Sequence, residues 1–127
     1  GVDLASAEDL SLWPGRKTLV RTGLKMAIPY GYELQIRPRS GMAYKTNLVI
    51  LNSPGTIDSD YRGEIKIPVK NGGNEILDIH KGDRIAQGIF TEVFQAEFQE
   101  EELGSTERGE GGFGHTGINN VVEFRHD

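Results

Sequence analysis

The sequence contains no cysteine. Disulfides, thiolate nucleophiles and cysteine-ligated zinc are therefore excluded. The absence also fits a reducing compartment, so we expect an intracellular protein, cytoplasmic or nuclear, or located in the host's compartments if the source is viral. No apolar run approaches the ~20 residues that a membrane-spanning helix needs, and the polar N-terminus carries no signal-peptide pattern. We therefore expect no membrane partner.

Basic residues are outnumbered: Lys and Arg together number 14, Asp and Glu 19, and the formal net charge is −5. A general nucleic-acid binder needs a basic face to meet phosphates, so we expect no nucleic-acid partner. A small polyphosphate ligand stays compatible with this balance, because it needs only a local cluster of cations. The 127 residues are typical of one domain.

A long helical stripe is also missing, and the helix candidate is a short turn near Met42–Lys45. Instead, apolar and polar residues alternate along short stretches, which is typical of half-buried strands. These stretches are Lys17–Leu24, Tyr32–Arg37, Asn47–Leu51, Gly63–Val69, Glu75–Ile79 and Ile85–Phe98. Their spacing of about 8–12 residues favours an all-β sandwich or barrel.

Turn signals separate the predicted strands. Asn71–Asn74 reads Asn-Gly-Gly-Asn and predicts a β-hairpin, because its glycines accept positive φ. Pro29–Gly31 and Lys81–Asp83 predict two further turns. The final stretch, Val121–Asp127, has some β character.

Glycine is abundant, at 17 residues, and it clusters between Gly104 and Gly117. We interpret this segment as a mobile arm, whose backbone N–H groups can approach an anion closely. Arg108 and Thr116 add donors for a phosphate. Phe113 has no core to join there, and its ring suits stacking on a nucleobase, which is worth about 1–3 kcal/mol. The alternative is a flexible tail with an incidental phenylalanine.

The segment Pro38–Ala43 ends one predicted strand and opens the predicted helical turn. A helix N-terminus gathers unpaired N–H groups and positive potential, which suits a phosphate. Arg39 and Ser40 would add side-chain donors. Alternatively, Ser40 caps the helix and Arg39 is solvated.

The segment Asn52–Glu64 contains three carboxylates close together in sequence. A hydrolase needs one carboxylate that orients and deprotonates a water, and Asp58, which follows Ile57 on a predicted bend, is the candidate. The alternative is a solvated acidic turn or a salt bridge with Arg62.

The segment Gly82–Phe90 leads from a turn into a predicted strand. Gln87 lies between Ile85 and Ile89 on one face, and a buried amide without a hydrogen-bond partner costs about 1–3 kcal/mol. A ligand phosphate, an ordered water or a neighbouring backbone group would supply that partner.

Together with Gly1–Ser6, these segments resemble, in the same order, the five motifs of the trimeric dUTPase family. The resemblance spans residues 1–117. It implies hydrolysis of dUTP to dUMP and pyrophosphate by water attack on the α-phosphate, which limits uracil incorporation into DNA and supplies dUMP for dTMP synthesis. It also implies a homotrimer of jelly-roll-like subunits, with residues 1–103 as the β-barrel domain and residues 104–127 as an exchanged arm that closes an active site.

The resemblance also carries the family's functional positions onto this sequence. Asp58 matches the catalytic carboxylate that activates water. The positions that bind uracil and deoxyribose match Asn52, Gly55, Thr56, Ile57, Tyr61 and Phe113. The phosphate-binding positions match Arg39, Ser40, Gly41, Gln87, Arg108, Gly114, His115 and Thr116. The family implies Mg²⁺ as cofactor, held by substrate phosphates and water without a direct protein ligand, with Asp3 supporting this region from a distance.

Arg84 matches a structural position of the family, and we expect it to pair with Asp58 or Asp60. Three features depart from the family pattern. His115 stands where the family usually has serine, which leaves its phosphate contact open. The chain begins inside the first motif, at Gly1, without the strand that usually precedes it. Residues 118–127 extend past the point where many members end, and the sequence assigns them no role.

Two other functions stay open at this point. A dCTP deaminase, an enzyme of related fold, would attack the base rather than the α-phosphate. A non-catalytic trimer would bind a nucleotide or a protein as a regulator, and we would expect it to lack Asp58 or the phosphate donors that this sequence keeps.

Overall fold

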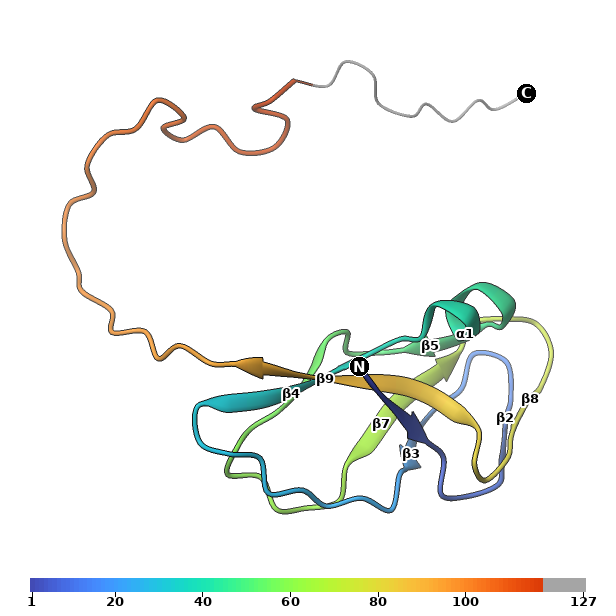
Figure 1. Ribbon diagram of the computed structural model, residues 1–127. Helices are drawn as coiled ribbons and strands as arrows, with labels where there is room; N and C mark the ends of the chain where they lie inside the picture. The colour runs from blue at the N-terminus through green and yellow to red at the C-terminus, as the bar shows by residue number, and fades with distance from the viewer. Residues whose placement is uncertain (118–127) are drawn as a thin grey trace, which may run out of the picture. The chain divides into compact units, whose positions relative to one another are not determined.

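The computed structural model describes residues 1–117. The chain divides into two units, the first ending at Gln95 and the second beginning at Ala96. Within the described residues, the first unit contains every strand and the helix (Figure 1). A helix able to span a membrane is absent from residues 1–117, where the α-helix has 6 residues.

The strands form three antiparallel sheets. The four-stranded sheet has the order β1 (Val2–Ala5), β9 (Arg84–Glu92), β4 (Tyr32–Arg37), β6 (Gly55–Ile57). The three-stranded sheet has the order β3 (Lys17–Arg21), β7 (Lys66–Asn71), β5 (Leu48–Ile50). The two-stranded sheet pairs β2 (Leu10–Leu12) with β8 (Leu77–Ile79). Helix α1 (Ser40–Lys45) connects β4 to β5.

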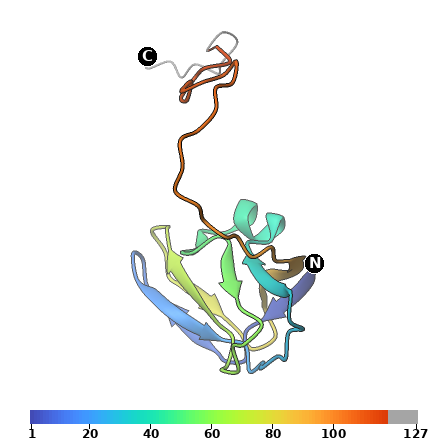
Figure 2. The same cartoon turned by 90° about the vertical axis from the view of Figure 1, so that its left-hand side faces the viewer.

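The core lies between the two larger sheets. Leu34 and Ile36 on β4 alternate with more exposed residues, and Ile67 and Val69 on β7 do the same. These buried side chains belong to one apolar cluster, so the buried faces of the two sheets pack against each other as a sandwich. In Figure 2, blue and yellow-green strands lie on the left of the molecule, and teal and dark blue strands on the right. Close packing favours glycine at position 88, because a Cβ there would lie 2.8 Å from the Leu34 side chain.

The all-β fold with one short helix is confirmed within residues 1–117. Each of the six predicted strand stretches overlaps an observed strand, but β9 ends at Glu92 rather than continuing to Phe98, and β7 begins only at Lys66. The short strands β1, β2 and β6, of three or four residues each, were not predicted. The β character of Val121–Asp127 lies outside the described residues.

Two of the predicted turns are confirmed. The Tyr32 N–H donates to Pro29 O at 3.1 Å, and Gly31 has a φ of +90°. The Asp83 N–H donates to His80 O at 2.9 Å, and Gly82 has a φ of +93°. In both turns glycine takes the left-handed conformation that a side chain disfavours.

The hairpin predicted at Asn71–Asn74 is wrong. β7 pairs with β3 and β5, whereas β8 pairs with β2, so the segment passes from one sheet to another. Neither Gly72 nor Gly73 has a positive φ. Their lack of a side chain serves close packing instead: the Gly72 N–H donates to Asn47 O at 2.8 Å, and a Cβ on Gly73 would collide with the Asn47 side chain.

Asn71 is the fully buried polar residue that fixes this crossing. Its Nδ2 donates to Leu12 O at 2.8 Å and to Glu75 O at 2.7 Å, and its Oδ1 accepts from the Gly73 N–H at 2.9 Å. One amide therefore joins β2, the end of β7 and the segment before β8.

We predict that Asn71→Ala lowers the free energy of unfolding by about 1–3 kcal/mol, because the substitution strands buried polar groups without partners. Urea denaturation measures this loss. Asn74→Ala, at an exposed position of the same segment, is the matched control and should change stability little. Equal stability of the two variants would contradict a structural role for the Asn71 amide.

Candidate active site

A pocket of about 390 Å³ opens beside the end of β6. Its walls are formed by Leu19, Thr56, Ile57, Asp58, Tyr61, Glu64 and Lys66. Four of the predicted site residues, from Thr56 to Tyr61, thus line one cavity. The side chains from β3 and β7 complete it, so the cavity joins both larger sheets.

The predicted uracil-binding segment makes a tight approach to its own backbone. Gly55 is buried, and a Cβ there would lie 3.2 Å from Asn52 Nδ2. Because Gly55 also pairs with Ile36 on β4, the loop that begins at Asn52 is held against the edge of the four-stranded sheet. Thr56 is exposed and Ile57 half-buried at the strand that follows.

The turn after β6 leaves the Asp58 side chain exposed. The Tyr61 N–H donates to Asp58 O at 3.2 Å, which closes the turn. Arg62 Nη1 donates to Ser59 O at 2.7 Å and to Tyr61 O at 3.1 Å. Arg62 therefore braces the backbone of the turn, and within residues 1–117 it makes no salt bridge with the turn's carboxylates.

Tyr61 lies against the chain that follows it. Its hydroxyl donates to Glu64 O at 2.8 Å. A Cβ on Gly63 would collide with the Tyr61 phenol, so glycine is what allows the ring to fold back over the backbone. The ring is 43% exposed, which leaves part of it open to the pocket.

Glu64 carries an ion pair at the pocket wall. Arg21 Nη2 donates to Glu64 Oε1 at 3.0 Å, and Arg21 Nε donates to Oε2 at 3.0 Å. The hydrogen bonds from Arg21 hold the pKa of the Glu64 carboxyl below its ordinary value, and Lys66 and Lys25 lower it further by charge. The pKa of Arg21 is raised in turn, chiefly by its hydrogen bond to Glu64.

A second group of predicted residues gathers around Asp3 on β1. Arg39 Nε donates to Asp3 Oδ1 at 2.9 Å, and Arg84 Nη1 lies 3.7 Å from Asp3 Oδ2. The expected pairing of Arg84 with Asp58 or Asp60 is therefore wrong. The reason is sheet order: β1 pairs with β9 so that Ala5 is opposite Arg84, whereas β6 lies at the other edge of the sheet.

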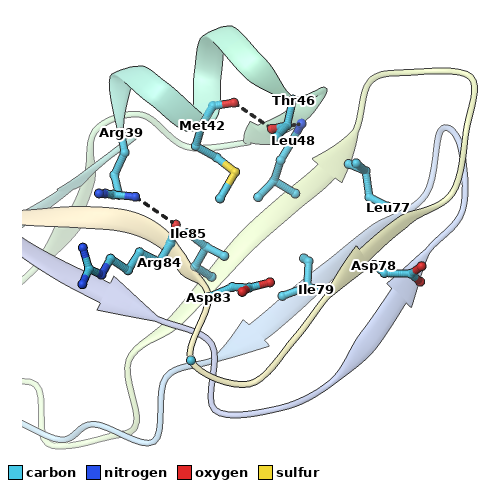
Figure 3. A pocket seen from close by; sticks show the side chains of 11 residues that line it. Arg39, Met42, Thr46, Leu48, Leu77, Asp78, Ile79, Asp83, Arg84 and Ile85 are labelled. Carbon is cyan, nitrogen blue, oxygen red and sulfur yellow. Dashed lines mark hydrogen bonds between the residues drawn. The ribbon is translucent and has the colours of Figure 1, made fainter.

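Arg39, Ser40 and Gly41 lead into α1. Arg39 occupies the N-cap position without a side-chain cap, and Ser40 is the first helical residue, so the alternative that Ser40 caps the helix is wrong. Arg39 and Arg84 also border a pocket of about 490 Å³ between α1 and the start of β9. Figure 3 shows both guanidinium groups on the same side of this pocket, with Met42 pointing toward its apolar wall.

Gln87 is half-buried on β9, directly opposite Asp3. Its Nε2 donates to Pro38 O at 2.9 Å. The neighbouring-backbone alternative for its partner therefore holds. The same bond ties the Arg39 segment to β9.

The two groups lie toward opposite ends of β4. Ile57, next to Asp58, is opposite Leu34, near the start of that strand. Arg39 follows Arg37, at its other end. At about 3.3 Å per residue, an extended chain from the level of Asp58 to Arg39 would span roughly 20 Å.

The predicted arm belongs to the second unit. Arg108 Nε donates to Gly111 O at 2.7 Å, and the Gly111 N–H donates to Arg108 O at 3.1 Å, so the two residues close a turn. The His115 N–H donates to Gly112 O at 2.9 Å. Phe113 is fully exposed, and Thr116 is exposed too. Positive φ angles occur at Gly109, Gly114 and Gly117.

Comparison with known proteins extends this description. A sequence profile of the dUTPase family matches residues 1–117. The chain belongs to the dUTPase family. It is 57% identical over 118 residues to the deoxyuridine 5'-triphosphate nucleotidohydrolase of Nautilia profundicola, covering 92% of this chain and 83% of that protein. It is 56% identical over 111 residues to the one of Fusobacterium nucleatum, covering 87% and 76%.

Solved dUTPase structures share the fold. The dUTPase of Staphylococcus bacteriophage 80alpha with dUpNHpp has a TM-score of 0.84 at 33% identity, covering 91% of this chain and 85% of that one. A mutant dUTPase from phage phi11 of S. aureus, described with a structural Mg(II) ion, has a TM-score of 0.74 at 28% identity, covering 80% and 82%.

Sequence reasoning missed three residues that line the pocket of this dUTPase, namely Leu19, Glu64 and Lys66. It also missed Arg21, which binds Glu64 from outside the pocket lining. Leu19 and Arg21 were recognisable as alternate residues of one predicted strand, and Lys66 as a member of another. The sequence alone does not reveal the strand register, which pairs Arg21 with Lys66 and brings Glu64 next to Arg21.

Proposed function

We propose that this dUTPase hydrolyses dUTP to dUMP and pyrophosphate by attack of a water on the α-phosphate, and so limits uracil incorporation into DNA while supplying dUMP for dTMP synthesis. One observation supports the proposal most directly: an exposed Asp58 carboxylate and the Tyr61 ring share a pocket at the edge of the four-stranded sheet. A carboxylate in that position can orient and deprotonate a water.

The nucleoside would occupy the pocket beside β6. Uracil would bind along the loop that begins at Asn52 and along β6, at Gly55, Thr56 and Ile57, and deoxyribose would lie on Tyr61. A ring packed under the sugar leaves no room for a 2′-hydroxyl. A tight backbone likewise excludes the methyl of thymine, a difference worth about 1–3 kcal/mol. Cytosine would leave donors and acceptors of the site unpaired, which discriminates far more strongly.

The triphosphate would bind the cationic group, which is the cluster around Asp3 that contains Arg39 and Arg84. Arg39, Ser40, Gly41 and Gln87 would contact it from the β4–α1 corner and β9. From the arm, Arg108, Gly114, His115 and Thr116 would add donors, while Phe113 would cover uracil. Donors fixed around the phosphates stabilise the charge that develops on the leaving pyrophosphate.

Assembly follows from the distance along β4. In-line attack requires the water, the α-phosphorus and the phosphate donors to converge on one triphosphate. With an extended span of roughly 20 Å from the level of Asp58 to Arg39, we propose that the cationic group of one copy faces the Asp58 pocket of another. The homotrimer with exchanged arms, in which residues 104–127 reach a neighbour's site, satisfies this requirement.

The proposed site would take magnesium together with the substrate. Among the described residues 1–117, no three His, Asp or Glu side chains gather closely enough to hold a metal ion. Asp3 is already engaged by two arginines. We therefore propose that Mg²⁺ is held by the substrate phosphates and water, where it would neutralise charge and fix the shape of the triphosphate. Asp3 would act from a distance, by holding Arg39.

The proposed function predicts pyrophosphate release from dUTP in the presence of Mg²⁺, with much slower release from dTTP, dCTP and UTP. The dominant reason is the pocket's fit to base and sugar, so the order of the four substrates is the informative result. A coupled pyrophosphate assay measures it. Ammonia release from dCTP would instead identify a deaminase, and absence of turnover with all four would favour the regulatory alternative.

Asp58→Asn should lower kcat for dUTP by about 10²–10⁴-fold, because the amide cannot accept the proton of the attacking water. Binding of the non-hydrolysable analogue dUpNHpp, measured by calorimetry, should persist. Asp60→Asn changes a carboxylate two residues away in the same exposed turn and should stay near wild-type activity. If Asp58→Asn retained most of its rate, Asp58 would not be the base.

The proposed assembly predicts complementation between two inactive variants. Asp58→Asn and Arg39→Ala are each expected to be nearly inactive. After refolding in an equal mixture, about a quarter of the sites should combine an intact Asp58 with an intact Arg39 from different copies. Activity of the mixture no greater than the sum of its parts would place both residues' action in one chain, and sedimentation of the same samples tests the trimer.

A further inference from the structure

The pocket wall contains an ion pair to which the proposed mechanism gives no task. Arg21, at the end of β3, binds both carboxylate oxygens of Glu64, which is 43 residues away in sequence. We propose that this pair, the Arg21–Glu64 clamp, positions the Tyr61 ring and thereby helps this enzyme to select deoxyribose over ribose. The inference rests on the proposed function, because Tyr61 matters for the sugar only if the nucleoside binds in this pocket.

Contacts run without a break from Arg21 to the Tyr61 ring. The Arg21 guanidinium holds the Glu64 side chain, and the Glu64 carbonyl accepts the hydrogen bond of the Tyr61 hydroxyl at 2.8 Å. Gly63, between the two residues, has no side chain to restrict the backbone. The clamp therefore acts on the residue that receives the phenol.

The clamp is anchored in a different sheet from the one that leads to Tyr61. Arg21 belongs to the three-stranded sheet, whereas Asp58 and Tyr61 follow β6 of the four-stranded sheet. Ile65, the residue after Glu64, is held near the end of β3 as well, because its N–H donates to Leu24 O at 2.8 Å. The clamp extends this attachment by one residue toward Tyr61.

The Glu64 carboxylate itself lines the pocket. Its Oε1 accepts from Arg21 Nε at 3.2 Å and from Nη2 at 3.0 Å, and its Oε2 accepts from Nε at 3.0 Å. Both oxygens are thus engaged by Arg21. Released from Arg21, the carboxylate would be free to accept a hydrogen bond from a ribose 2′-hydroxyl, so loss of the clamp favours UTP in two ways.

An ion pair of this kind also has a plain structural role, and partly exposed pairs contribute little to stability. The Arg21 side chain is 57% exposed and that of Glu64 16%. The two roles differ in what they change. A structural pair alters stability alone, whereas a positioning pair alters the environment of Tyr61 and the preference between two sugars.

The experiment compares Arg21→Gln with Arg21→Lys, which keeps the charge but loses the two-point contact, and with Arg16→Gln, an exposed arginine of the same region. The readout is the ratio of kcat/KM for dUTP to that for UTP. We expect the ratio to fall about two- to fivefold in Arg21→Gln, on the scale of a partly exposed ion pair. It should fall less in Arg21→Lys and stay unchanged in Arg16→Gln.

A second readout needs no nucleotide. In protein labelled with 3-fluorotyrosine, the ¹⁹F resonance assigned by Tyr61→Phe should shift or broaden in Arg21→Gln and not in Arg16→Gln. An unchanged resonance, or an unchanged ratio in an active Arg21→Gln enzyme, overturns the clamp alone. Failure of the wild-type protein to hydrolyse dUTP overturns the proposed function and the sugar selectivity with it, whatever the resonance does.

Discussion

The register of β4 between its two neighbours is the constraint on which the rest of the molecule depends. β9 pairs along all of it, from Tyr32 opposite Glu92 to Arg37 opposite Gln87, while β6 pairs only with residues 34–36. A slip of one residue would turn Leu34 out of the core. The same slip would displace the residues at both ends of the strand, so the hydrogen bonds that specify the fold also specify the separation of the two halves of the site.

Local features of this chain were predictable because their causes are local. Alternation along Tyr32–Arg37 gave β4 its correct bounds, and the glycines of two turns gave their positions. The order of five motifs led to the family, which the comparisons establish. The pocket residues between Thr56 and Tyr61 were predictable because they are close in sequence. A strand and the turn directly after it place their side chains near one another.

What stayed out of reach depends on which strands become neighbours. Many carboxylates lie near some arginine in sequence, and only sheet order decides that Arg84 meets Asp3 rather than Asp58. The Arg21–Glu64 pair was hidden for the same reason. The error at Gly72 and Gly73 has a different source, since glycine is required both by left-handed turns and by close packing, and sequence alone does not separate these causes.

Asp3 holds two guanidinium groups, at 2.9 and 3.7 Å. Immobilising a long side chain at a binding event costs about 0.5–1.5 kcal/mol. Because Asp3 restrains Arg39 when the chain folds, the proposed triphosphate site would avoid much of that cost at binding. At the proposed triphosphate site, Arg39 would therefore meet an anion while Asp3 still holds its guanidinium, rather than being drawn in from solvent.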